Sequence, residues 1–118
     1  LSDKPRIVVI KGVPLIDDDG QKLSNVGFDK ESGSFWRIDW DHIPVHYPGT
    51  GDIFTSVLTA SLLKGESLPI ALNRATTFTE IAVKTTYSYG TEPRLGVLFE
   101  DCLSWLMTNT VLSDYKKL

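Results

Sequence analysis

The feature that most constrains this 118-residue chain is a glycine turn followed directly by an apolar helical pattern. The turn is Gly49-Thr50-Gly51-Asp52, and apolar residues recur at helical spacing from Asp52 onward. Two glycines one residue apart let the backbone turn tightly and present several N–H groups to one point. The positive end of the helix dipole adds to the same field. The stretch therefore predicts a strand end, a turn and a helix start that together hold an anion.

Asp52 is unexpected at such a position, because a carboxylate repels the anion that the turn would bind. Its charge has a use if it takes a proton from a hydroxyl that is about to attack a phosphorus atom. The alternative is a tight strand-to-helix connection in which the helix dipole favours an acidic residue. Two other phosphate motifs are excluded, because no Gly-Lys-Ser/Thr follows and the glycines lack the dinucleotide spacing.

The chain before the turn alternates in a way that predicts an antiparallel meander of strands. In the third of these segments Trp36, Ile38 and Trp40 share one face. The expected strands cover residues 6–11, Leu23–Phe28, Ser34–Trp40 and Ile43–Tyr47.

Three helices are expected after the turn, because the apolar period changes to that of a helix. The first extends from about Asp52 to a cap at Gly65, and the second from Ser67 to near Gly90. The third follows Pro93. Strands followed by helices predict the carboxyl-terminal part of a layered α/β domain.

Five further side chains have both a chemical and an ordinary interpretation. Lys11 would either reach nucleotide phosphates or lie exposed at a strand end. His42 and His46 would share a strand face, but no third ligand stands nearby, so no metal site is expected. Trp36 and Trp40 would either stack on a ring or fill the core.

Bulk composition narrows the possible partners. A net charge of -3 without a basic run argues against a nucleic-acid surface. No apolar run approaches the roughly 20 residues that span a membrane. The single cysteine, Cys102, cannot form an internal disulfide, which fits a cytoplasmic protein.

Several of these motifs together resemble a known enzyme family. Residues 48–54, followed by an apolar helix, closely resemble the signature of the ribokinase-like superfamily of sugar and vitamin kinases. Val8–Gly12, the Phe35-Trp36 strand and the stretch Tyr89–Glu100 resemble bacterial pyridoxal and pyridoxamine kinases. The resemblance covers essentially the whole chain.

The resemblance implies a ribokinase-like fold and ATP-dependent phosphorylation of the 5′-hydroxymethyl group of pyridoxal, pyridoxine or pyridoxamine, with Mg²⁺ on the phosphates. Asp52 matches the catalytic base, and residues 49–51 (Gly49, Thr50 and Gly51) match the anion hole. Positions that match the family's nucleotide contacts or the wall beside the nucleotide are Lys11, Ile43, Val45, Pro48 and Phe54.

Members of that family are more than twice as long, and their amino-terminal half carries the pyridoxal pocket, much of the metal-coordinating acidic patch and the dimer lid. Residues 1–118 are therefore expected to be the carboxyl-terminal, nucleotide-binding and catalytic-base part of a kinase, inactive alone and homodimeric in the full-length protein. Two alternatives stay open. One is a kinase for another hydroxymethyl compound, such as a pyrimidine precursor of thiamine or a sugar. The other is a non-catalytic nucleotide-binding module, against which Asp52 argues.

Overall fold

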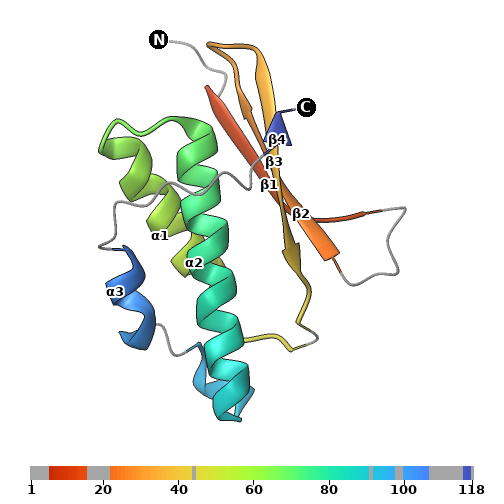
Figure 1. Cartoon of the computed structure of the whole chain (residues 1–118), viewed down its shortest axis with the longest axis vertical. Helices are drawn as coiled ribbons and strands as arrows, with labels where there is room; N and C mark the ends of the chain where they lie inside the picture. The colour runs from red at the N-terminus through yellow and green to blue at the C-terminus, as the bar shows by residue number, and fades with distance from the viewer. Residues whose placement is uncertain are drawn as a thin grey trace.

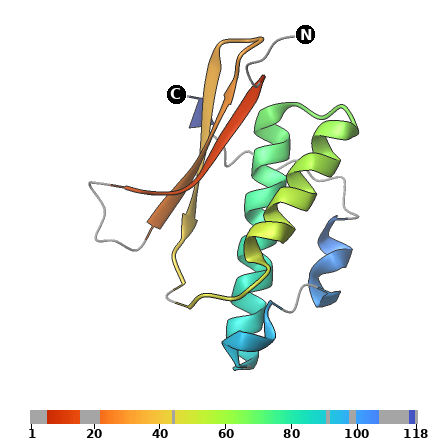
Figure 2. The same cartoon turned by 180° about the vertical axis from the view of Figure 1, so that it is seen from behind.

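In the computed structural model, a four-stranded sheet carries two long helices on one face (Figures 1 and 2). The structure describes residues 6–15, 22–43, 45–90, 92–97, 100–106 and 116–117. In chain order the elements are β1 (Ile7–Pro14), β2 (Lys22–Asp29), β3 (Ser34–Asp41), α1 (Thr50–Leu63), α2 (Leu68–Tyr89), the 3₁₀ turns η1 (Pro93–Leu95) and η2 (Glu100–Cys102), α3 (Leu103–Leu106) and β4 (Lys116–Lys117). The predicted class, an antiparallel meander followed by helices, is confirmed.

The sheet has the order β1-β2-β3-β4, and every neighbouring pair is antiparallel. In β3, Ile38 is buried in the core beneath the helices and Trp36 packs against that core. Phe35, one residue from Trp36, is 48% exposed on the other face. The alternation predicted for this strand is confirmed.

A β-bulge interrupts β1 at the point where the sequence predicted the strand to end. Between the regular pairs at Ile10 and Val13, both Lys11 and Gly12 oppose the single residue Asn25 of β2. Gly12 adopts a φ of 72°, which favours glycine. The strand therefore continues to Pro14, and the prediction that it closes at Gly12 is wrong because this glycine serves the bulge.

The short strand predicted over Ile43–Tyr47 is also wrong. Residues 43 and 45–47 have no regular structure, and the Val45 N–H donates to the Ile43 carbonyl over 2.7 Å. This bond closes a turn too tight for a strand. Prolines at positions 44 and 48 also lack the N–H that a central strand needs.

Two helices follow at the predicted places. Helix α1 begins at Thr50 and α2 begins at Leu68, with Ser67 as its N-cap residue. Each ends before a glycine with positive φ, Gly65 or Gly90. The glycine signals in the sequence were therefore sufficient to locate both carboxyl ends.

The third predicted helix is replaced by shorter pieces. After η1, Gly96 adopts φ 82° and ψ -175°, a conformation that no helix accommodates. The chain then forms η2 and the four-residue α3. The apolar spacing after Pro93 predicts one helix, but Gly96 breaks it.

Two apolar clusters connect the layers. The first joins the sheet to both long helices through Ile38, Phe54, Leu72 and Ala75. The second joins α2 to the carboxyl-terminal pieces and is formed by Phe78, Ala82 and Cys102. Phe54, near the start of α1, therefore lies in the core that fixes this helix against the sheet.

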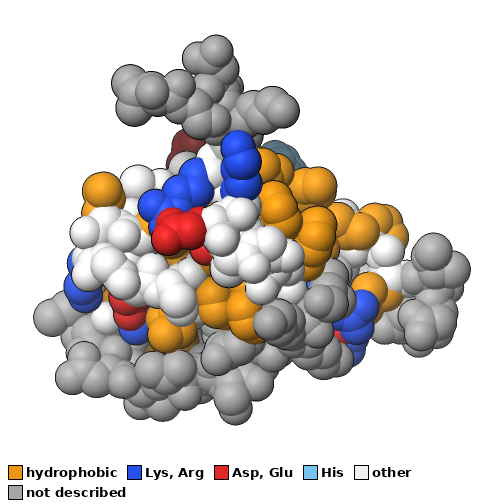
Figure 3. Space-filling model, turned by 90° about the horizontal axis from the view of Figure 1, so that it is seen from above, with side chains coloured by type: hydrophobic (Ala, Val, Ile, Leu, Met, Phe, Trp, Pro, Cys, Tyr) orange, Lys and Arg blue, Asp and Glu red, His pale blue; other side chains and the backbone are white. Residues whose placement is uncertain are grey.

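The opposite face of the sheet is not covered by any helix that the structure describes (Figure 2). On β1, Val8 and Ile10 are 40% and 57% exposed. The end of the molecule with the β2–β3 and α1–α2 turns carries basic and acidic side chains close together among hydrophobic ones (Figure 3). Within the described ranges, no helix is long and apolar enough to cross a membrane.

Candidate active site

The turn and the helix start that the sequence predicted are both present, although residues 45–47 before them form no strand. Gly49 adopts φ 92° as the N-cap residue of α1, and its carbonyl accepts the first helical hydrogen bond, from Ile53 N–H, over 3.0 Å. The Thr50 hydroxyl donates to the Tyr47 carbonyl over 2.7 Å and anchors the turn to a buried residue. The turn is thus held rigidly at both ends.

The first N–H groups of α1 have no helical acceptor, because the helix has not yet completed a turn. No side chain caps them. The Thr50 N–H makes a long contact of 3.4 Å to the Tyr47 carbonyl. The N–H groups of Gly51 and Asp52 remain, and they are directed out of the helix start. Free N–H groups at a helix start, together with the helix dipole, are able to attract an anion.

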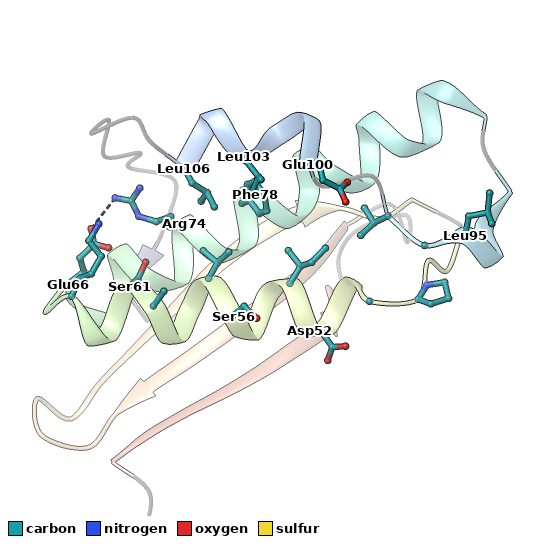
Figure 4. A pocket seen from close by; sticks show the side chains of 18 residues that line it. Asp52, Ser56, Ser61, Glu66, Arg74, Phe78, Leu95, Glu100, Leu103 and Leu106 are labelled. Carbon is teal, nitrogen blue, oxygen red and sulfur yellow. Dashed lines mark hydrogen bonds and ion pairs between the residues drawn. The ribbon is translucent and has the colours of Figure 1, made fainter.

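Asp52 lies in the first turn of α1 and is exposed. Its carboxylate points away from the groove into which Phe78 and Leu103 extend (Figure 4). Within the described part of the chain it accepts no hydrogen bond and pairs with no cation. It is therefore free to accept a proton from a molecule bound beside the turn.

Lys11 lies at the β1 bulge, on the same face of the strand as Val9, which packs against the core, and its side chain reaches this turn. Its Nζ lies 5.3 Å from the centre of the Phe54 ring. It is also 3.2 Å from the position that a Cβ on Gly51 would occupy. The ammonium group thus adds a positive charge directly beside the helix start, and Lys11 is in mid-strand rather than at the strand end that the sequence suggested.

Two adjoining hollows lie between the sheet, the turn and α2. One, of about 230 Å³, is lined by Lys11, Thr50, Gly51, Phe54 and Ile43, among others. The other, of about 570 Å³, is also lined by Ile43 and Thr50 and extends past Val45. The structure therefore brings four of the five predicted nucleotide-contacting residues to one side of the turn.

Pro48, the fifth, lies on the other side. With Gly49 and Asp52 it lines one end of a groove of about 750 Å³ between α1, α2 and α3. The far end of this groove holds the ion pair of Arg74 and Glu66 at 3.0 Å (Figure 4). The glycine turn thus separates two hollow regions, with Lys11 on one side and Asp52 at the edge of the other.

A cluster of charges borders the smaller hollow. The Asp41 N–H donates to Glu80 Oε2 over 2.8 Å, and the Asp41 carboxylate accepts from Lys84 Nζ over 3.0 Å. Through this hydrogen bond and its charge, the Lys84 ammonium group lowers the pKa of Asp41. The same contact raises the pKa of Lys84. These residues stabilise the rim where β3 ends and α2 passes.

Two contributors to the site, Asn25 and Gly96, were missed by the sequence interpretation. Asn25 and Trp40 hydrogen-bond each other behind Lys11, over 3.1 Å. Gly96 packs so closely on the turn that an added Cβ would lie 3.1 Å from the Pro48 carbonyl oxygen. Gly96 falls in the stretch that carries the family resemblance, and this was the available signal for it.

The described residues do not form a metal site of their own. No group of three or more His, Cys, Asp and Glu side chains that could hold a metal ion occurs among them. His42 and His46 both line the 570 Å³ hollow, without a third ligand from the described chain. Magnesium held mainly by nucleotide phosphates and water would need only one or two carboxylates from the protein.

Comparison with known proteins identifies the family. The profile of the phosphomethylpyrimidine kinase family matches residues 1–95. A search of curated proteins finds no match to the chain.

Solved structures agree with this family. A Bacteroides thetaiotaomicron protein provisionally named phosphomethylpyrimidine kinase, crystallised with pyridoxal, is 38% identical with a TM-score of 0.88, over 97% of this chain and 40% of its own. The pyridoxal kinase of Lactobacillus plantarum is 28% identical with a TM-score of 0.68, over 85% of this chain and 36% of its own. The pyridoxal kinase of Leishmania donovani, in complex with ADP, is 20% identical and shares the fold, with a TM-score of 0.76 over 96% of this chain and 38% of its own.

The chain therefore spans about two fifths of the length of these structures. Their fold confirms the ribokinase-like architecture that the glycine turn indicated. This chain belongs to the phosphomethylpyrimidine kinase family, a family of kinases within the ribokinase-like superfamily.

Proposed function

We propose that this chain is the nucleotide-binding and catalytic-base part of a kinase that transfers the γ-phosphoryl group of ATP to a hydroxymethyl group of a B6 vitamer. The observation that carries the proposal is the free, exposed carboxylate of Asp52 beside an anion-binding helix start. The helix dipole would favour an acid here in a purely structural turn as well, but the proposal also accounts for the lack of a partner for this carboxylate.

The proposed reaction follows from the arrangement around the turn. Asp52 accepts the proton of the substrate hydroxyl as its oxygen forms a bond to the γ-phosphorus. The bond from that phosphorus to the bridging oxygen breaks, and ADP leaves with the electron pair. The N–H groups of Gly51 and Asp52 stabilise the charge on the transferring phosphoryl group, and Gly49 and Thr50 shape the turn that presents them.

Lys11 and the two adjoining hollows would receive the nucleotide. The ammonium group of Lys11 attracts phosphate oxygens, and Ile43, Val45 and Phe54 provide apolar surface for the remainder. ADP in the related Leishmania structure supports the nucleotide assignment. Pro48 lines the groove of about 750 Å³ on the other side of the turn, so its role is to shape the turn rather than to contact the nucleotide.

Two relatives support pyridoxal as the acceptor. The 38% identical protein was crystallised with pyridoxal, and the 28% identical protein is a pyridoxal kinase. The family description favours a second candidate, a hydroxymethylpyrimidine. Both acceptors offer a hydroxymethyl group on an aromatic heterocycle, so the chemistry at Asp52 is the same.

The test uses the full-length protein that contains this chain. ATP-dependent phosphorylation of pyridoxal, pyridoxine, pyridoxamine and hydroxymethylpyrimidine is measured side by side as kcat/KM. A preference for the B6 vitamers is expected. A preference for the pyrimidine would replace the acceptor, and ATP binding without phosphorylation of any of them would overturn the kinase assignment. The isolated 118-residue chain is expected to be inactive.

A further inference from the structure

We infer that Asn25 is a positioning residue for Lys11: its side chain fixes the β1 bulge that places the Lys11 ammonium group at the helix start. This inference rests on the proposed nucleotide role of Lys11. Asn25 itself belongs to β2 and was not among the residues that the sequence singled out.

Asn25 is 4% exposed and connects three elements by its amide group. Its Oδ1 accepts hydrogen bonds from the Gly12 N–H over 3.0 Å and from Trp40 Nε1 over 3.1 Å. Its Nδ2 donates to Thr76 Oγ1 in α2 over 2.9 Å. One side chain therefore connects β1, β3 and α2 beside the hollow of about 230 Å³.

The bond to Gly12 is the one that acts on Lys11. At the bulge, Lys11 and Gly12 both oppose Asn25, so the regular ladder between β1 and β2 is interrupted there. The Asn25 side chain accepts the hydrogen bond of the Gly12 N–H in place of a strand carbonyl. The direction in which the Lys11 side chain leaves the strand is thereby fixed.

That direction matters because the space at the end of Lys11 is narrow. Its Nζ lies 5.3 Å from the centre of the Phe54 ring, and a Cβ added to Gly51 would come within 3.2 Å of it. A small change in the bulge would move this charge away from the helix start. The flexible lysine side chain would then have to be ordered by the ligand, which weakens binding.

Asparagine suits this position because it both accepts and donates. Aspartate would lose the donor to Thr76 and place a charge in a buried position, and alanine would leave two N–H groups without an acceptor. Asn25→Ala therefore releases the bulge, and its effect should reach the nucleotide through Lys11.

The test is a double-mutant cycle in the full-length protein, with steady-state KM for ATP, KM for the acceptor and kcat as readouts. Asn25→Ala is expected to raise the KM for ATP about five-fold, with kcat and the KM for the acceptor changed less than about two-fold. In a Lys11→Met background, the same substitution is expected to cause no further rise.

Two other variants keep the test decisive. Gly12→Ala strains the bulge from its other side. Its φ of 72° disfavours alanine, although the space for a methyl group is open. The same dependence on Lys11 is therefore expected, even if Asn25→Ala does not fold.

Ser24→Ala is the matched control. Ser24 is the next residue of β2, is 1% exposed, and donates to Asp39 over 2.9 Å on the opposite face. It should lower the melting temperature and leave the KM for ATP unchanged.

The outcomes separate the two proposals. If Lys11→Met leaves the KM for ATP unchanged, the nucleotide role of Lys11 fails and this inference fails with it. Suppose instead that Lys11→Met raises the KM for ATP. If Asn25→Ala and Gly12→Ala then have no effect on this KM, or raise it by the same factor in the parent protein and in the Lys11→Met variant, only the positioning role of Asn25 is overturned.

Discussion

Lys11 Nζ lies 5.3 Å from the centre of the Phe54 ring, whose π face attracts the ammonium group, and the Lys11 side chain is exposed. Phe54 is 4% exposed and belongs to the core that joins sheet and helices. The ring is therefore a fixed support for a charge that would otherwise move freely at the end of a long side chain.

This support leads to the first prediction. Lys11→Met keeps the alkyl chain and removes the charge, so the KM for ATP in the full-length protein is expected to rise about ten-fold, which corresponds to about 1.4 kcal/mol. Lys30→Met in the β2–β3 turn is the control and should leave it unchanged. An equal effect of both substitutions would mean that Lys11 acts only through the general charge of the protein.

The second prediction concerns Asp52. Asp52→Asn preserves the shape of the side chain but removes the base, so kcat is expected to fall about 10²- to 10⁴-fold. The Kd for ATP, measured by calorimetry, should stay within about two-fold or become tighter, because a negative charge near the phosphates is lost. Asp29→Asn, at the end of β2, is the control for removing a carboxylate. Retained turnover would contradict the base role.

Local patterns predicted a large part of this fold. The glycine turn, the beginnings and ends of α1 and α2, and the alternation of Trp36 and Ile38 each depend on residues close together in the chain. Capping glycines and a two-residue period of apolar residues can be recognised in the sequence itself. For the same reason the glycine turn and Asp52 could be found without a structure.

The features that were missed depend on distant partners. The hydrogen bond from Asn25 to Thr76 joins residues 51 positions apart, and no local pattern around Asn25 indicates it. The sequence alone predicts a strand end at Gly12, because a glycine serves a strand end and a bulge equally well. Gly96, in contrast, could have been recognised as a break in the third predicted helix, although not as a neighbour of Pro48.

The third prediction separates stability from function at the glycine turn. Gly49 and Gly65 lie at opposite ends of α1 with φ of 92° and 91°, and neither has an atom within 4 Å of an added Cβ. Alanine at either position should therefore cost a similar free energy of unfolding, about 1–2 kcal/mol, from backbone strain alone.

Only one of these two variants should alter catalysis. Gly49→Ala displaces the N–H groups of the turn and is expected to lower kcat/KM at least ten-fold when measured well below its melting temperature. Gly65→Ala should retain the activity of the parent protein. If both variants lost activity in proportion to their melting temperatures, the turn would have no direct role in the reaction.

The fourth prediction concerns the pH dependence of the Asp41–Lys84 pair. Lys84 lowers the pKa of Asp41 below its ordinary value of 3.8, and Asp41 raises the pKa of Lys84 above 10.5. The stabilisation from Asp41 is thus present above pH 3.8 and is lost as the pH falls through its folded-state pKa. The stabilisation from Lys84 is present below pH 10.5 and is lost as the pH rises through its own.

Both side chains are about half exposed, so the pair should contribute only about 0.2–1 kcal/mol in water. Lys84→Met is expected to lower the melting temperature of the full-length protein at pH 6. This difference from the parent protein should shrink at pH 3, below the ordinary pKa of 3.8, where Asp41 takes up a proton in the unfolded chain. The measurement is thermal unfolding at both pH values, with Lys30→Met as the control for removing a lysine. A difference that stays constant or grows on acidification would show that Lys84 stabilises the fold by packing along α2 rather than by its charge.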